Sequence, residues 1–330
     1  MTSRTRLGVG DLSLAQQARR GLLDRQIERY PRAWHALRLL AFALAVIGGL
    51  LGAWVLWMHI TGDPLADANA YYQAADRLNH GQPLYPANAD ATHNTIYLYP
   101  PLLAIVFRPL ALLPYYAFAL TWEIVVVGSF LLTIRQLGGG SRVYIAIGIL
   151  GIPIGWALGV AQAHIPMTLL LAIGQPWSIA LATNIKLFPA LIALWWVGRK
   201  EFQSVIAFAG WLLIFGIVQL VLEPTGTLAF LRGAIGFGQL GDVRNISPYA
   251  WASPEAWAAF LLVGMLVTVA LARTRWGWAA AVFLGTLSPP RLLVYMLTGL
   301  LAAVRTPHIS GDPEPDRLPT AAEAYVSSAR

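Results

Sequence analysis

The chain has 330 residues, of which 57% are hydrophobic and only 12% are charged. Soluble domains carry about 25% charged residues, so the composition excludes an ordinary soluble domain and indicates a polytopic membrane protein. The formal net charge of +7 does not indicate nucleic-acid binding, because the basic residues are concentrated at the N-terminus and in short connections between apolar runs. The chain contains no cysteine, which excludes disulfides and thiolate catalysis.

The first 38 residues contain eight arginines and three acidic residues. By the positive-inside rule, this bias predicts that segment 1–38 lies in the cytoplasm. Arginines alternate with leucines between Leu12 and Tyr30, which predicts an amphipathic surface helix that either anchors the segment or regulates the protein. Residues 306–330 are rich in proline, alanine and acidic residues and are predicted to be a disordered cytoplasmic tail.

Apolar runs recur between residues 39 and 305, and many are close to the roughly 20 residues that cross a bilayer as a helix. Predicted spans lie near 39–60, 115–134, 143–160, 177–198, 202–222, 255–273, 277–288 and 291–304. Two further stretches, 100–114 and 161–174, are interrupted by proline and by Arg108 or His164, and are predicted to be re-entrant or half-depth helices. The expected fold class is an all-α polytopic membrane bundle of about eight to ten segments.

Basic residues in the short connections mark the cytoplasmic side of this bundle. They are Arg135, Arg142, Arg199, Lys200, Arg273 and Arg275. With this topology the two long connections, 61–99 and 223–254, face outward. The predicted catalytic unit is therefore residues 39–305, a multi-pass domain of the plasma membrane that presents its polar loops at the outer face.

The first outer connection places acidic residues directly after the first span. Pro64 suits the first turn of a helix, helical spacing continues to Asn79, and Gly81 is suited to end the helix. Asp67 then falls in the first turns, where the helix dipole favours an ionised carboxylate. From the residues alone, Asp67 is either a functional acid or a group that caps or solvates its helix.

Five segments resemble, in order and spacing, the signature segments of glycosyltransferase family 87. They are DANAYYQAADRLNHGQPLY (67–85), YLYPPLLAIVFRPLALLP (97–114), NIKLFPALIALWWVGRKEF (184–202), NISPYAW (245–251) and LSPPRLLVY (287–295). The resemblance extends over about residues 40–305 and implies a GT-C-like fold. Tyr295 stands where many members carry a histidine, and Ile246 stands where the outer loop usually has glutamine.

The resemblance implies a cell-envelope glycosyltransferase that moves mannose or a similar sugar from a polyprenyl-phosphate donor to a hydroxyl of a lipid or glycan acceptor at the outer face. The leaving phosphate is already a stable anion, so this reaction needs one base and no general acid, unlike glycoside hydrolysis. Asp67 matches the outer-loop aspartate of the family and is the candidate base, with Asp63 as second choice. No cofactor is expected, the histidines fit no zinc spacing, and a divalent-metal requirement stays open.

Cations are expected to hold the donor phosphate. Lys186 interrupts an apolar span, where a charge costs roughly 2.5–3.5 kcal/mol and is a functional candidate by default; snorkelling or pairing with a backbone carbonyl is the alternative. Arg291, Arg108 and His164 are further candidates, and interfacial anchoring is the alternative for the two arginines. Expected contacts to the sugar or acceptor are Tyr71, Tyr97, Tyr99, Asn245 and Tyr295, although tyrosines also populate the interfacial belt of membrane proteins.

Two other functions stay open from the sequence. A transporter or flippase of a lipid-linked sugar would also place ionisable groups and broken helices within the bilayer, but transporters often carry repeated halves, and the sequence shows no internal repeat. A catalytically inactive GT-C-like membrane protein would keep the fold without the chemistry.

Overall fold

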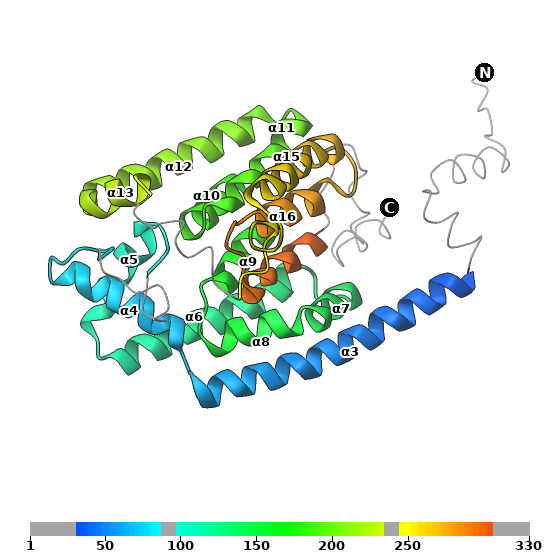
Figure 1. Ribbon diagram of the computed structural model, residues 1–330, viewed down its shortest axis with the longest axis horizontal. Helices are drawn as coiled ribbons and strands as arrows, with labels where there is room; N and C mark the ends of the chain where they lie inside the picture. The colour runs from blue at the N-terminus through cyan, green and yellow to red at the C-terminus, as the bar shows by residue number, and fades with distance from the viewer. Residues whose placement is uncertain (1–30, 87–96, 234–243, 306–330) are drawn as a thin grey trace, which may run out of the picture.

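The computed structural model describes residues 31–86, 97–233 and 244–305, and within these ranges every regular element is a helix. Figure 1 shows a bundle of long and short helices with one long helix, α3, along its lower side. The predicted amphipathic helix at 12–30 and the predicted tail at 306–330 lie outside the described residues. Residues 87–96 and 234–243 of the two outer connections also lie outside them.

Four helices among the described residues are long and apolar enough to cross a bilayer, which confirms the prediction of an all-α polytopic membrane protein. They are α3 (Pro31–Gly62), α6 (Tyr115–Gln136), α12 (Phe202–Leu222) and α15 (Pro254–Leu271). A fifth candidate span is broken: α7 (Ser141–Ile149) and α8 (Gly151–Gly159) meet at an angle of 72°. Gly151 and Pro153 follow the break, and both residue types favour a kink in an apolar helix.

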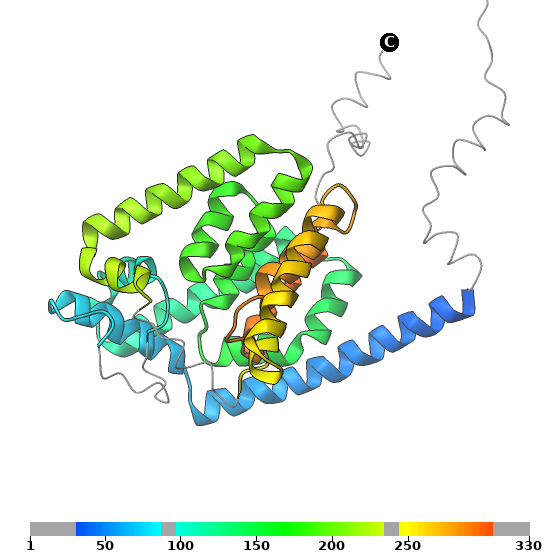
Figure 2. The same cartoon turned by 45° about the horizontal axis from the view of Figure 1, so that its top comes forward.

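Shorter helices fill the interior between the long ones. They are α9 (His164–Ile173), α10 (Pro176–Ile185), η2 (Phe188–Ile192), α11 (Ala193–Arg199), α16 (Gly277–Leu287) and η4 (Val294–Val304). Figure 2 shows α10 and α11 enclosed between α12 and the rest of the bundle. Many of the largest fully buried side chains come from these short helices, among them Trp278 and Leu171, and from α6, among them Phe118. The outer helices α3, α12 and α15 instead expose many large apolar side chains, as expected for surfaces that face lipid.

The predicted span at 177–198 is wrong as a single helix, because the chain turns back within it. Gly174 packs against Trp278, and the ring of Trp195 lies 5.1 Å from the ring of the same Trp278. Both ends of the segment are therefore at one end of the bundle, and α10 and α11 form a re-entrant hairpin with Lys186 near its tip. The α-helix stops at Ile185 because the ring of Pro189 would clash with the carbonyl group four residues earlier.

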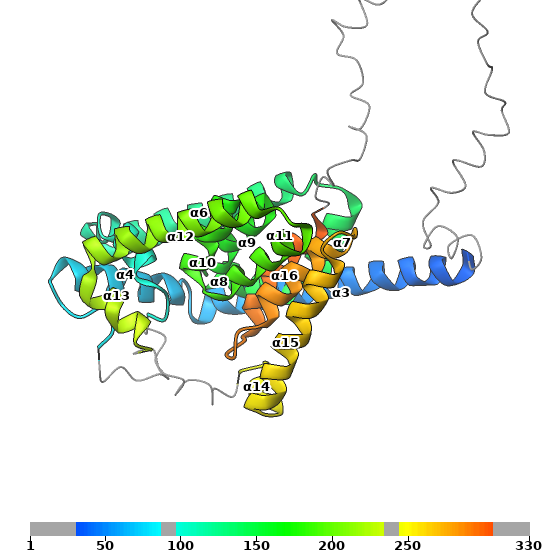
Figure 3. The same ribbon diagram turned by 90° about the horizontal axis from the view of Figure 1, so that it is seen from above.

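The connections that carry the predicted cytoplasmic arginines lie at one end of the molecule. The α15–α16 connection contacts the end of α11, where the Arg273 Nε donates a hydrogen bond of 3.3 Å to the Gly198 carbonyl oxygen. The opposite end is built from α4 (Ala66–Asn79), α5 (Pro101–Phe107), η1 (Leu110–Leu112) and α13 (Pro224–Leu231). Figure 3 shows α4 and α13 at the end of the long axis away from α7. The basic connections and the polar α4 region are thus separated by the length of the bundle.

Candidate active site

The site begins where the first turn of α4 meets the junction between α8 and α9. The Leu65 amide donates to the Gly159 carbonyl oxygen at 3.3 Å, and the Asp67 amide donates to the Val160 carbonyl oxygen at 3.1 Å. Leu65 and Ala161 both have a φ near +57°, a conformation that is uncommon for residues other than glycine. These contacts fix the start of α4 against a chain segment that lies almost a hundred residues away in sequence.

The Asp67 side chain points toward this junction and does not cap its own helix. Its Oδ2 accepts a hydrogen bond of 2.8 Å from the Gln162 Nε2, and α4 has no side-chain cap. The carboxyl group is half-buried, so it is surrounded by protein but keeps some accessible surface. This orientation favours the functional interpretation of Asp67 over the capping one.

Gln162 joins Asp67 to two tyrosines that the sequence had also marked. Its Oε1 accepts hydrogen bonds from the hydroxyls of Tyr71 at 2.6 Å and Tyr99 at 2.5 Å. The Tyr71 hydroxyl also accepts the Ala163 amide at 3.1 Å. These tyrosines are buried, so they form the inner wall of the site and are not exposed sugar-stacking platforms.

The electrostatic environment makes Asp67 an unusual carboxyl group. It lies on α4, outside the spanning helices, yet burial raises the pKa of Asp67 from its ordinary 3.8 to about 7. Asp63 adds to this rise, whereas the positive charges of Lys186, Arg291 and Arg244 lower the same pKa. The three cations therefore lie close enough to act on the carboxylate, although they come from three separate segments of the chain.

Lys186 reaches the site from the tip of the α10–α11 hairpin. Its Nζ lies 4.2 Å from the centre of the Tyr99 ring, a cation–π geometry. The tip is held from the side by Gln219 of α12, whose Nε2 donates to the Asn184 Oδ1 at 2.7 Å. The Gln219 Oε1 accepts the Leu102 amide of α5 at 3.0 Å. The hairpin thus delivers an ammonium group to the site from within the bundle.

Asn245 links Arg244, its neighbour in sequence, to the segment that carries Arg291. Its Nδ2 donates to the Pro290 carbonyl oxygen at 2.9 Å, and its Oδ1 accepts the Leu292 amide at 2.9 Å. Asn245 was predicted to contact the sugar or acceptor; the structure uses its side chain to hold the outer loop against residues 290–292.

Ring contacts line the side of the site next to α9 and η4. The His164 and Tyr295 rings lie 5.3 Å apart, and the Tyr295 ring also contacts Trp156 at 6.1 Å. The His164 Nδ1 is buried and finds no hydrogen-bond partner among the described residues. Asp63 lies further out, where it is exposed and bonded to the His59 Nδ1 at 2.7 Å.

Two predicted site residues form their hydrogen bonds elsewhere, although the Tyr97 ring lies 5.6 Å from that of Tyr99. The Arg108 Nε donates to the Asn79 Oδ1 at 3.1 Å, at the far end of α4 from Asp67 and so about 18 Å away by helical rise. The Tyr97 hydroxyl donates to the Pro100 carbonyl oxygen at 2.7 Å and accepts the Ala104 amide at 3.0 Å. Arg108 and Tyr97 therefore fasten α5 rather than face the Asp67 cluster.

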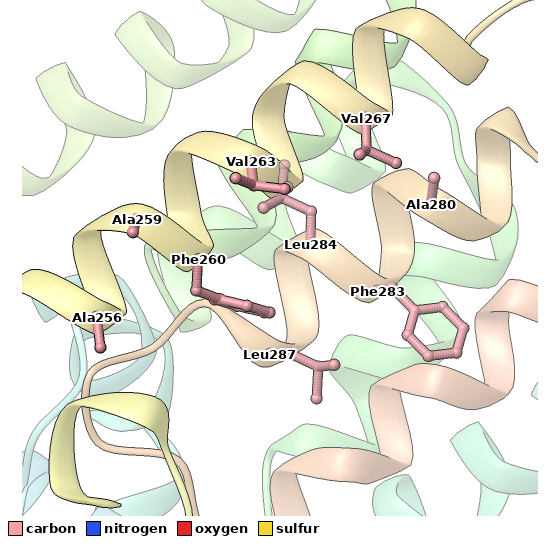
Figure 4. A pocket seen from close by; sticks show the side chains of 10 residues that line it. Ala256, Ala259, Phe260, Val263, Val267, Ala280, Phe283, Leu284 and Leu287 are labelled. Carbon is pink, nitrogen blue, oxygen red and sulfur yellow. The ribbon is translucent and has the colours of Figure 1, made fainter. Parts of the chain in front are cut away.

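An apolar pocket of about 510 Å³ opens between α15 and α16 and ends close to the site. Figure 4 shows side chains of both helices lining it, from Ala256 and Leu287 at one end to Val267 and Ala280 at the other. The lining of α15 runs from Ala256 to Val267, and the eleven helical rises between them correspond to a groove about 16 Å long. At the end marked by Ala256 and Leu287, the Trp257 Nε1 donates to the Ser288 carbonyl oxygen at 2.8 Å, three residues before Arg291.

The sequence analysis missed Gln162 and Arg244. Gln162 is an uncharged amide in an apolar stretch, and its only local signal is that polarity among alanines and valine. Arg244 lies directly before the segment 245–251 that resembles the family loop. This position next to a predicted site loop was the signal that could have identified it. Among the described residues, no three histidine, aspartate or glutamate side chains come together as a metal-ligand group.

The profile of glycosyltransferase family 87 matches residues 97–307. The chain belongs to glycosyltransferase family 87. The match begins after α4, so it includes Lys186, Asn245 and Arg291 but not Asp67.

Two curated relatives of this family 87 protein carry the same name, polyprenol-phosphate-mannose-dependent alpha-(1-2)-phosphatidylinositol pentamannoside mannosyltransferase. The protein from Mycobacterium tuberculosis (strain CDC 1551 / Oshkosh) is 27% identical over 232 residues, which cover 63% of this chain and 52% of that protein. The protein from Mycolicibacterium smegmatis (strain ATCC 700084 / mc(2)155) is 27% identical over 277 residues, which cover 73% of this chain and 66% of that protein. The chain thus spans about half to two thirds of the length of these relatives. No solved structure matches it.

Proposed function

We propose that this protein is a mannosyltransferase that uses polyprenol-phosphate-mannose as donor and a hydroxyl of a lipid-linked glycan as acceptor, with Asp67 as general base. The observation that carries the proposal is the convergence of one half-buried carboxyl group and three cations in one site. The names of the two relatives support the donor class and an acceptor of the phosphatidylinositol mannoside type.

The reaction fits the distribution of charge in the site. The Asp67 carboxylate takes the proton of the acceptor hydroxyl while the acceptor oxygen forms a bond to the anomeric carbon. The bond from that carbon to the phosphate oxygen breaks, and polyprenyl phosphate leaves with one more negative charge than the phosphate carried as a diester. Negative charge therefore moves from Asp67 to the phosphate, and Lys186 and Arg291 stabilise it more strongly in the transition state than in the bound substrate.

The pKa of Asp67 suits this role. A general base works best when its pKa lies near the operating pH, because it is then both available and strong enough to take a proton. A pKa of about 7 meets that condition, whereas an exposed aspartate would be a weaker base. The buried His164 Nδ1, without a partner among the described residues, offers one further hydrogen bond to a bound substrate.

The groove between α15 and α16 accommodates the isoprenoid tail of the donor in this proposal. Its lining is apolar, and the end at Ala256 and Leu287 lies next to Ser288, beside the segment that carries Arg291. A tail lying there would place the donor phosphate at the cationic site, while the isoprenoid units stay at the depth of the bilayer. The proposal also places the site at the outer face of the plasma membrane and the N-terminus in the cytoplasm.

The decisive experiment compares the wild-type protein with Asp67→Asn in lipid nanodiscs, using radiolabelled polyprenol-phosphate-mannose and a phosphatidylinositol mannoside acceptor. We expect Asp67→Asn to lower turnover by about 10²–10⁴-fold, the range of general-base catalysis, while donor affinity is retained. The matched control is Asp76→Asn, on the same helix and partly exposed next to His80, which should keep its turnover.

Two results would count against the proposal. If Asp67→Asn transferred mannose at the wild-type rate, Asp67 would not be the base. If the wild-type protein moved the intact lipid-linked sugar across a bilayer without transferring it, and Asp67→Asn did the same, the flippase alternative would hold.

A further inference from the structure

We propose that Gln162 is a positioning residue that holds the base Asp67 and the cation Lys186 in one fixed arrangement, through the two ends of its side-chain amide. This inference rests on the proposed function, because it assigns the roles of base and phosphate ligand to those two residues.

The first step is the orientation of the amide. Both tyrosine hydroxyls approach the same Oε1, at 2.6 and 2.5 Å, and the Asp67 carboxylate approaches the Nε2 at 2.8 Å. The flipped amide would present its carbonyl oxygen to a carboxylate, and two acceptors would then face each other without a proton. The surroundings therefore select the orientation in which Gln162 donates to Asp67.

The second step is the connection to the cation. Tyr99 donates its hydroxyl proton to Gln162 and presents its ring face to the Lys186 Nζ at 4.2 Å. The chain of contacts therefore runs from Asp67 through Gln162 and Tyr99 to Lys186. It joins α4, the α8–α9 junction, the segment before α5 and the tip of the α10–α11 hairpin, none of which is adjacent in sequence.

The third step is the rigidity of the Gln162 backbone. Gln162 has no solvent exposure, and its backbone N–H donates to the Ala157 carbonyl oxygen at 2.8 Å. The preceding carbonyl oxygen, that of Ala161, accepts the Trp122 Nε1 at 2.8 Å. A side chain anchored in this way can fix the groups around it, whereas Asp67 and Lys186 both retain accessible surface.

The consequence is a joint effect on the base and on donor binding. A hydrogen bond donated to the ionised carboxylate favours the charged form, so its loss raises the pKa of Asp67. Loss of the Oε1 also removes the acceptor of the Tyr99 hydroxyl, which keeps its hydrogen bond with the Tyr71 hydroxyl at 2.9 Å, and so loosens the ring that faces Lys186. The other charged and titratable groups around Asp67, none of which the substitutions remove, are Asp63, Arg244, Arg291, His164, Tyr71 and Tyr295.

The test uses Gln162→Leu, which removes both ends of the amide, and Gln162→Glu, which keeps the acceptor for the tyrosines and removes the donor to Asp67. The pKa of Asp67 is read from the infrared band of its protonated carboxyl group, assigned by the difference from Asp67→Asn. Donor affinity is measured by titration with polyprenol-phosphate-mannose. Thr133→Val is the matched control, because Thr133 is another buried polar side chain, whose hydroxyl donates to the Ser129 carbonyl oxygen at 2.8 Å within α6, near the basic end of the bundle.

We expect Gln162→Leu to raise the pKa of Asp67 by about one unit or more, because the ionised carboxylate loses a hydrogen bond that favours it. Gln162→Glu should raise it further, because its carboxyl group adds a like charge next to Asp67. Gln162→Leu should also weaken donor binding several-fold, whereas Gln162→Glu should weaken it less because Tyr99 keeps its partner. The control should leave the pKa of Asp67 unchanged. The infrared readout needs no turnover, so the inference and the proposed function can fail separately.

The inference is overturned if either measurement stays at its wild-type value in folded Gln162→Leu. An unchanged pKa would show that Gln162 does not act on the base, and an unchanged donor affinity would show that it does not act on the cation. If Gln162→Leu does not fold, Gln162→Met, which has nearly the same volume as glutamine and no amide, decides the question through the same two measurements.

Discussion

At the scale of single residues, Asp67 combines two opposing influences. Burial raises its pKa, and Lys186, Arg291 and Arg244 lower it, with about 7 as the outcome. Because the pKa of Asp67 in the folded protein lies above the ordinary value of 3.8, the ionised form of Asp67 opposes folding. The stability that the protonated form contributes is complete below pH 3.8 and is lost as the pH rises through about 7. A group kept at this cost to stability is typical of a functional site.

The pH dependence of transfer follows from the same balance. A base must be unprotonated, so kcat/KM should rise with pH and level off above about pH 7. Replacing Lys186 by methionine removes a charge that lowers the pKa of Asp67, so the rise should move to higher pH. Donor affinity should fall by about tenfold, which corresponds to about 1.4 kcal/mol.

Lys200→Met is the matched control for that measurement, because Lys200 lies in the basic connection at the other end of the bundle. Rate profiles between pH 5 and 9 and donor titrations of both variants check the prediction. A Lys186→Met profile identical to that of the wild type would rule out an action of Lys186 on Asp67.

At the scale of elements, glycines set the distance between α3 and α8. A Cβ on Gly52 would lie 2.3 Å from the Gly151 carbonyl oxygen, and a Cβ on Gly151 would lie 2.1 Å from the Gly48 carbonyl oxygen. Small residues allow membrane helices to pack with their backbones in close approach. Since α8 leads directly into the junction that holds Gln162, this packing also positions the candidate site.

Gly52→Ala should therefore destabilise the protein by about 1–3 kcal/mol, as expected for overpacking. Gly49 is the control on the same helix, because nothing lies within 4 Å of a Cβ built there. Gly49→Ala should be neutral or stabilise the helix by up to about 1 kcal/mol. Thermal unfolding of both variants in detergent measures the difference, and equal melting temperatures would contradict the close approach of α3 and α8.

The groove between α15 and α16 gives a second prediction for an element. Ala259 lines the groove, and a tryptophan at this position should block it. We expect Ala259→Trp to raise KM about tenfold or more for a long polyprenyl donor, with little change for a donor that carries only two isoprene units.

Leu262→Trp is the control for the groove, because Leu262 is exposed on α15 outside the pocket lining. Transfer assays with both donors separate the outcomes. If Ala259→Trp affected the two donors equally, the tail would not lie between α15 and α16.

At the scale of the whole molecule, the basic connections and the candidate site lie at opposite ends of the bundle. Arginines and lysines collect on the cytoplasmic side of membrane proteins, so the α4 end should face outward. The absence of cysteine from the chain makes single-cysteine variants unambiguous reporters of this orientation.

His80→Cys, at the end of α4, should react with a membrane-impermeant maleimide in intact cells. Lys200→Cys should react only after the cells are permeabilised. Both positions are exposed, so a difference in labelling reports sidedness. The reverse labelling pattern would place the candidate site in the cytoplasm.

Hydropathy was enough to predict the membrane class and the four long helices, and two charged residues, Asp67 and Lys186, could be singled out before any contact was known. Hydropathy and helical spacing are local properties of the sequence. They are enough to predict a membrane-spanning helix where about 20 apolar residues follow one another. Asp67 and Lys186 stood out because charges are scarce in this chain.

Tertiary structure alone decided which of these residues meet. The turn of the chain at Lys186, the amide of Gln162 next to an aspartate 95 positions earlier, and the departure of Arg108 and Tyr97 from the site all depend on packing between distant segments. Local patterns fix which face of a helix is apolar, but not which helix covers that face. For this reason a buried neutral glutamine gave almost no signal in sequence, although it holds a central place in the folded site.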